Sequence, residues 1–176
     1  MRLTSGETPL EQSAEVTWDP INTYNESAID EQQAFVGTVH GMIDAIYTRI
    51  ESLQSLTKQV SLRKELAAAA EDEAALAAAE ALLENLEAWQ KSVTTPDRET
   101  FQDVLNFHPR IDAFLIDLLQ QADKAVLGLT DGQRQRLDDL QPQWQHAMDA
   151  WNALIENDVA TFNEDAGPAV TTPAWD

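Results

Sequence analysis

Residues 36–60 read VGTVHGMIDAIYTRIESLQSLTKQV, and this stretch decides the fold class. Its apolar residues recur at steps of three and four, the spacing that places side chains on one face of an α-helix. Glu51 and Lys58 lie off that face, as solvent-facing residues of an amphipathic helix do. We predict one long helix with a single apolar stripe, interrupted only at Thr57 and formed by Val36, Val39, Ile43, Ile46, Ile50, Leu53 and Val60.

Polar and charged residues predict where this helix begins and ends. Ser27 is the predicted N-cap, and Asp30 and Glu31 follow in the first turn, where the helix dipole favours anions. No Gly or Pro occurs from residue 43 to 94, and one helix over that span would reach roughly 80 Å. The change from basic residues at 63–64 to acidic residues at 71–73 predicts a turn within 67–73, although the alanines at 67–70 favour a continuous helix.

A second apolar stripe predicts another helix after this turn. Ten of the fifteen residues from Ala67 to Ala81 are alanine. Such small side chains suit either close helix packing, which we favour, or a docking groove for a partner helix. The stripe consists of Leu76, Ala79, Leu83, Leu86 and Val93, with Leu82 and Trp89 beside it.

Proline and glycine divide the chain that follows. Thr95-Pro96 predicts a helix start, with Thr as N-cap and Pro at the first helical position. This short helix would carry Phe101, Val104 and Leu105. Pro109 is expected to open a further helix, which Gly128 should end. The apolar residues of that helix are Ile111, Phe114, Leu115, Leu118 and Ala122.

Thr130 and Gln133 form the capping-box pattern, which predicts the start of the last helix. Pro142 should kink this helix, and Gly167-Pro168 should end it. Trp144 and Trp151 are one heptad apart, and we expect them in the core rather than on a surface that stacks sugars. The apolar stripe is Leu137, Leu140, Trp144, Ala147, Met148, Trp151, Leu154, Ile155 and Phe162.

Residues 1–26 do not follow the helical pattern. Ala14, Val16 and Trp18 alternate with polar residues up to Asp19-Pro20, which is typical of a short strand. One or two strands cannot stand alone, so they either lie on the bundle or, as we favour, residues 1–26 are the tail end of a preceding β domain. The predicted fold is all-α, an antiparallel up-and-down bundle of three to four helices over 27–165, with a short N-terminal β segment and a flexible tail over 166–176.

The charge of the chain limits its partners. The net charge is −20, from 31 acidic and 11 basic residues, which argues against nucleic acid because such binding needs a basic footprint. No apolar run approaches the ~20 residues of a membrane span, and no cysteine is present. An acidic surface favours solubility, and it also suits cations or a basic partner.

Catalytic and metal-binding patterns were not found in the sequence. A carboxylate di-metal site in a bundle needs Glu-x-x-His pairs, but Gly37, Leu105 and Gln143 occupy the position three residues before the histidines. His40 and His146 are therefore interpreted as boundary residues, and His108, which precedes Pro109, as a helix-entry residue. We predict no catalytic, cofactor-binding or metal-ligating residue and no enzymatic activity.

Several segments resemble the C-terminal helical region of bacterial sortilin-like, BNR-repeat β-propeller proteins, which are often labelled glycosyl hydrolases. The resemblance rests on the stretch LNFHPRI at 105–111, on Thr130-x-x-Gln133 followed by Leu137, Leu140 and Trp144, and on the strand ending in Asp19-Pro20. It spans most of residues 10–165. It implies an extracytoplasmic, periplasmic or secreted, location and a propeller upstream that would hold any hydrolase chemistry.

These observations lead to two functional expectations. The first is a non-catalytic C-terminal accessory domain of a larger exported protein, with a structural or docking role toward the upstream propeller. The alternative is a free-standing acidic bundle that binds a protein partner through the alanine-rich helix or the acidic face. Neither expectation involves a cofactor, nucleic acid or membrane insertion.

Ile46→Ala tests the helical stripe. Truncating a buried isoleucine should lower the free energy of unfolding by ~2–5 kcal/mol, because the side chain leaves a cavity. Urea denaturation followed by circular dichroism measures this loss. A loss below ~1 kcal/mol would mean that the stripe at 36–60 is not part of the core.

Overall fold

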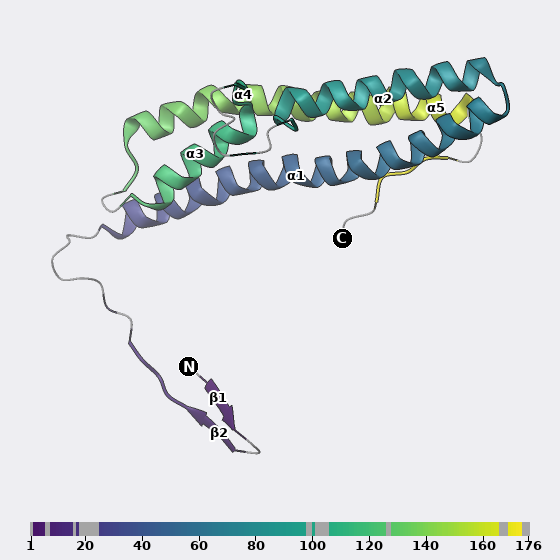
Figure 1. Ribbon diagram of the computed structural model, residues 1–176. Helices are drawn as coiled ribbons and strands as arrows, with labels where there is room; N and C mark the ends of the chain where they lie inside the picture. Colours follow the sequence, from purple (N-terminus) through teal and green to yellow (C-terminus); the bar gives the residue numbers. More distant parts are fainter. Residues whose placement is uncertain are drawn as a thin grey trace.

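A computed structural model describes residues 2–5, 8–15, 17, 25–97, 100, 106–125, 128–165 and 169–173. Their helices assemble into an all-helical bundle, as the sequence predicts (Figure 1). The elements are α1 (Glu26–Ala69), α2 (Glu73–Val93), α3 (Ile111–Asp123), α4 (Asp131–Ala153), the π-helical segment η2 (Leu154–Val159) and α5 (Ala160–Asp165).

The bundle consists of three rows of helices that lie side by side. The first row is α1, the second is α2 followed by α3, and the third is the continuous run of α4, η2 and α5 (Figure 1). Each row contacts the other two, and successive rows run in opposite directions. The chain therefore goes up along α1, down along α2 and α3, and up again along α4 to α5.

A tight turn at 70–72 separates α1 from α2, inside the range that the charge pattern predicts. The N–H of Asp72 donates to the carbonyl of Ala67 at 3.0 Å, and the N–H of Glu71 donates to that of Ala68 at 3.3 Å. This pair of bonds is the Schellman ending of a helix. Asp72 then caps α2, since its Oδ1 accepts from the N–H of Ala75 at 3.0 Å. Alanines 67–69 still belong to α1, and the chain turns at Ala70 because both helix ends at the turn are capped.

The buried face of α1 is shifted slightly from the predicted stripe. Val39, Ile46, Leu53 and Val60 are buried as predicted, but the row beside them contains Met42 and Leu56. The shift reflects coverage of α1 from two sides, by α2 and α3 on one and by α4 on the other. In α2 the buried residues are Ala79, Leu82, Leu86, Trp89 and Val93, so Leu82 and Trp89 belong to the centre of the stripe, whereas Leu76 and Leu83 are half-buried.

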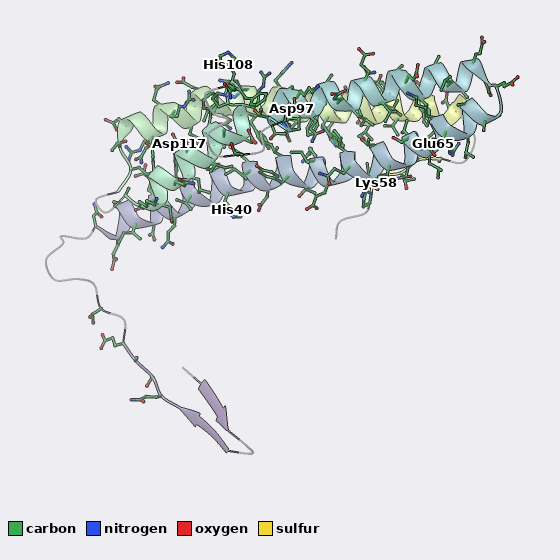
Figure 2. The ribbon with its side chains drawn as sticks, in the orientation of Figure 1. His40, Lys58, Glu65, Asp97, His108 and Asp117 are labelled. Atoms are coloured by element: carbon green, nitrogen blue, oxygen red, sulfur yellow. The ribbon has the colours of Figure 1, made fainter. Side chains whose placement is uncertain are left out.

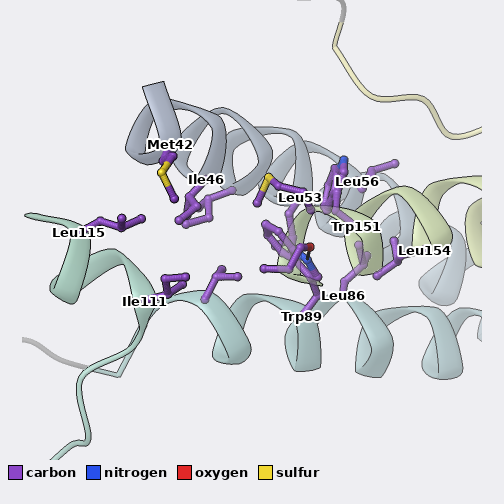
Figure 3. Close-up of a cluster of buried hydrophobic side chains, with 14 of the residues drawn as sticks. Met42, Ile46, Leu53, Leu56, Leu86, Trp89, Ile111, Leu115, Trp151 and Leu154 are labelled. Atoms are coloured by element: carbon purple, nitrogen blue, oxygen red, sulfur yellow. Dashed lines mark hydrogen bonds between the residues drawn. The ribbon is translucent and has the colours of Figure 1, made fainter. Parts of the chain in front are cut away.

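Tryptophans join the three rows, as Figure 3 shows around Trp89 and Trp151. Their rings pack with centroids 4.7 Å apart and an interplanar angle of 55°. The indole N–H of Trp89 donates to the carbonyl of Ala147 at 2.9 Å, and that of Trp144 donates to Met42 at 3.0 Å. The prediction that Trp151 lies in the core is confirmed, and Trp144 is half-buried and packs against the core, whereas Trp18 and Trp175 lie outside the described residues.

Several predicted helix boundaries need correction. The N-cap of α1 is Asn25 rather than Ser27, because the Asn25 side chain accepts from the Ser27 N–H at 3.1 Å. α3 ends at Asp123, not at Gly128. Gly128 instead has a φ of 89°, and a Cβ there would lie 3.2 Å from the Cβ of Ala28, so glycine fits the backbone and the space. The predicted helix through residues 101–105 lies outside the described residues.

The last row begins as predicted, with a capping box between Thr130 and Gln133. The helix then continues through Pro142 without a break, and its irregularity comes later, in η2. A π-helical turn adds one residue to the spacing. This extra residue turns Val159 and Phe162 into the core, where they are buried.

The regions outside the bundle differ from the prediction in part. Strands β1 (Arg2–Ser5) and β2 (Thr8–Glu11) pair antiparallel. The strand predicted from Ala14 is not formed by the described residues 12–15 and 17, and Val16 and Asp19-Pro20 lie outside them. The assignment of 1–26 to a preceding β domain stays a prediction.

The described part of the tail, residues 169–173, packs against the bundle instead of extending freely from it. Val170 is buried, with 3% of its surface exposed, and it belongs to the main core. Burial of Val170 and hydrogen bonds to its backbone join these residues to the bundle, and the flexibility of the tail stays a prediction.

Glu71→Gly tests the turn between α1 and α2. Glu71 has a φ of 55°, a conformation that costs a non-glycine residue about 1 kcal/mol. Glycine should raise the free energy of unfolding by up to about that amount, whereas the matched change Glu84→Gly, at an exposed position inside α2, should lower it by a similar amount. Thermal and urea denaturation measure both. A destabilised Glu71→Gly variant would contradict the left-handed turn.

Candidate functional site

The three histidines do not come together. His40 on α1 pairs with Asp44 at 3.0 Å on the surface. His108 lies beside the α2–α3 connection on another side of the bundle, as Figure 2 shows, and its carbonyl accepts from the Thr95 hydroxyl at 3.3 Å. Within the described ranges, no three side chains of the metal-ligating types group closely enough to hold an ion.

Asp112 is the buried charged residue of the described core, with 8% of its surface exposed. Its carboxylate accepts three hydrogen bonds: from the Thr94 hydroxyl at 2.7 Å, from the backbone N–H of Ala113 at 2.7 Å, and from the Tyr47 hydroxyl at 3.5 Å. Burial, and then the charge and hydrogen bond of Asp112, raise the pKa of Tyr47. These hydrogen bonds join the end of α2, the start of α3 and the middle of α1. The carboxylate oxygens of Asp112 are therefore already occupied by contacts within the bundle.

A groove of about 960 Å³ lies where α2 ends and α3 begins, facing the middle of α4 and the start of η2. The second row of the bundle is interrupted there, because α2 stops at Val93 and α3 starts at Ile111. The side of α4 opposite this interruption carries the small residues Ala147, Ala150 and Ala153. Short side chains next to a helix junction leave the groove open.

The groove has an apolar lining with a few polar groups. Trp89, Ile111, Phe114 and Leu154 supply its large apolar side chains. The guanidinium of Arg136 lies 4.9 Å from the Phe114 ring centroid, and this contact supports the ring from outside the groove. The polar lining residues are Asn85, Ser92, Arg110, Gln143, His146 and Asp158.

A hydrogen bond bridges the groove at its η2 end. Asn85 of α2 donates to Asp158 of η2 at 3.2 Å. Beyond this bridge lies a second hollow of about 250 Å³, between α2 and the η2–α5 segment, and both residues line it as well. The two hollows therefore follow one line along the α2 side of the third helix row.

The helices that form the groove are strongly acidic. Residues 71–90 contain six acidic residues and no basic one, and residues 137–176 contain eight acidic residues and no basic one. Two bases nearby are paired: Lys64 lies 2.9 Å from Glu80, and Lys91 binds Glu87, which raises the pKa of Lys91. Arg110 is the basic residue that lines the groove itself.

The sequence does not predict this site. The alanine-rich stretch 67–81 suits either packing or a groove, but in the structure Ala67 and Ala79 are buried while Ala68, Ala69, Ala70, Ala74, Ala77 and Ala81 are exposed. His146 does line the groove, although it was interpreted as a boundary residue. The available signal was the run of alanines at 147, 150 and 153, which gives α4 a face of small side chains.

We found no match to the chain among protein-family models, curated proteins or solved structures. None of the helices in the described part is both long and apolar enough to cross a membrane. What the fold and the site define is a class of protein, an acidic helical bundle with an open, apolar-lined groove.

Tyr47→Phe tests the buried Asp112 group. Because the pKa of Tyr47 is raised on folding, the folded protein keeps a proton that the unfolded chain releases above about pH 10. Wild-type stability should therefore fall as the pH rises through this value, and the variant should lack that part of the loss. Urea midpoints between pH 8 and 11 measure the difference. Parallel curves for the two proteins would contradict the contact between Tyr47 and Asp112.

Proposed function

We propose that this bundle is a non-catalytic docking domain whose groove binds a basic protein segment. The observation that carries the proposal is the 960 Å³ groove between α2, α3 and α4, lined by large apolar side chains at its base and by alanines on α4. A helix or loop with a few apolar residues fits such a surface, since small side chains permit close approach of backbones.

The charge distribution supports a basic partner. Both rows that border the groove are rich in carboxylates, and exposed residues such as Glu84, Asp149 and Glu156 lie on them. Acidic surfaces speed encounter with basic partners and select against acidic ones. Arg110, just before α3, and Asp158, in η2, both line the groove and would fix the direction of the bound segment through opposite charges.

The resemblance to the helical region of sortilin-like, BNR-repeat proteins supports a specific version of this proposal. In that version the bundle is an accessory domain of a larger exported chain, outside the cytoplasm, and the bound segment belongs to the upstream propeller. The free-standing version differs only in the source of the segment, which then belongs to a separate protein. The groove serves equally in both.

Site-specific photo-crosslinking tests the proposal and separates the two versions. A photo-crosslinking phenylalanine analogue replaces Ala150 in the groove, and the matched control replaces Asn152, which is exposed on α4 but does not line the groove. The source cells express each form, and an antibody against residues 27–165 detects the products in cell extract and culture fluid.

We expect an adduct at Ala150 that is absent at Asn152, contains a Lys- or Arg-rich segment by mass spectrometry, and weakens at high salt. A band far above 19.6 kDa before irradiation, in the exported fraction, supports the accessory-domain version. A band at 19.6 kDa that gains mass on irradiation supports the free-standing version. Equal adducts at both positions, or none at Ala150, would contradict the proposal.

A further inference from the structure

Residues 169–173 lie extended along the surface formed by α1 and α5, as the yellow trace beside α1 in Figure 1 shows. One side chain of this segment is an anchor: Val170 is buried with 3% exposure, whereas Ala169, Thr171 and Thr172 are exposed. The segment is therefore held through one apolar side chain, and its other contacts involve the backbone.

Two side-chain amides bind the backbone of successive residues. The Oδ1 of Asn163, on α5, accepts from the N–H of Val170 at 2.7 Å, and its Nδ2 donates to the Val170 carbonyl at 3.0 Å. The Oε1 of Gln59, on α1, accepts from the N–H of Thr171 at 3.1 Å, and its Nε2 donates to the Thr171 carbonyl at 2.8 Å. Each amide thus satisfies both polar groups of one peptide residue.

Gln59 is held in position for this role by its own helix. Its Nε2 also donates to the Ser55 carbonyl and to the Ser55 hydroxyl, both at 3.3 Å. These contacts lie within one turn of α1, so they do not require the bound segment. A pre-oriented amide loses little side-chain entropy on binding, which strengthens its hydrogen bonds to a peptide.

This arrangement has the features of an extended-peptide site. Paired hydrogen bonds to the N–H and C=O groups of a bound strand give affinity without regard to sequence, and pockets for particular side chains give selectivity. Here two residues are bound through their backbone and one pocket is filled by a β-branched side chain.

We propose that the surface around Gln59 and Asn163 is a binding site for an extended peptide, and that residues 169–173 occupy it as a displaceable ligand in cis. The partner is a strand-like segment with Val or a similar β-branched apolar residue as anchor. It needs a free N–H at the anchor and at the next residue, so proline is excluded from both positions. The following side chain is unrestricted, because Thr171 is exposed.

The tethered segment sets an upper bound on the dissociation constant of the site for a separate peptide. A segment tethered close to its site has an effective concentration on the order of millimolar, so an ordered cis contact implies a dissociation constant below about 1 mM. The site lies on α1 and α5, whereas the groove lies between α2, α3 and α4. The inference therefore stands or falls separately from the proposed docking function.

Fluorescence anisotropy with a labelled peptide of residues 167–176, GPAVTTPAWD, tests the site. The receptor is the full chain carrying Val170→Asp, which removes the anchor of the cis segment, and circular dichroism verifies its helical fold. The full chain carrying Thr171→Pro is a second receptor. This change removes the N–H that donates to Gln59, and it leaves every buried side chain unchanged.

We expect saturable binding to both receptors below about 1 mM and binding to wild type at least tenfold weaker, because its own segment competes. A peptide carrying Thr171→Pro, or a receptor also carrying Gln59→Ala, should bind about tenfold more weakly for the loss of hydrogen bonds. The matched change Gln54→Ala, on an exposed part of α1, should have no effect.

Absence of binding to folded receptors at about 2 mM peptide would overturn the proposal. Binding that is unaffected by Gln59→Ala would overturn it as well, since the peptide would then lie elsewhere. If wild type forms a dimer by exchanging the segment between two copies, the same peptide must dissociate that dimer, and a dimer that resists the peptide contradicts the site.

Discussion

The apolar face of α1 must be covered along its full length, and in the described part of the chain no other helix is long enough to do so alone. α1 has 44 residues, about 66 Å of helix, whereas α2 has 21 and α3 has 13. The chain meets this requirement by placing α2 and α3 one after the other along α1, and by extending α4 through η2 and α5 on the remaining side. The groove is a direct consequence, because the junction of two short helices cannot be packed as closely as the middle of one long helix.

Polar groups fix the rows relative to one another at a few places. The buried Trp89 and the half-buried Trp144 each direct one N–H to a carbonyl in another row. Gln32 of α1 donates to the carbonyl of Ala122, in the last turn of α3, and to that of Ala125, just after this helix. Buried donors and acceptors are costly when unpaired, so these bonds penalise sliding of one row past another. The register of the bundle thus depends on specific polar contacts as well as on apolar burial.

The two proposed surfaces would recognise partners by different physics. The groove offers apolar side chains and surrounding negative charge, so its selectivity would come from shape and electrostatics. The α1–α5 surface offers amides that bind peptide backbone, together with a single apolar pocket. The first suits a helix or loop with basic residues, and the second suits an extended segment. An acidic bundle without a recognised catalytic pattern can in this way still hold two segments of polypeptide.

The sequence by itself determined the helical class, the stripe centred on Val39, Ile46, Leu53 and Val60, the turn near 70–72 and the capping box at Thr130, because these depend on local spacing and local hydrogen bonds. The placement of Trp151 in the core also followed from spacing. The tertiary structure decided which edge of each stripe is buried, the shift of register at η2, and the ordering of residues 169–173 on α1. It also decided the groove and the burial of Asp112, which bring together residues from three or four elements. Periodicity reports the face of one helix, whereas a groove or a bound tail depends on which faces meet, and that is set by helix lengths and contacts between residues far apart in the chain.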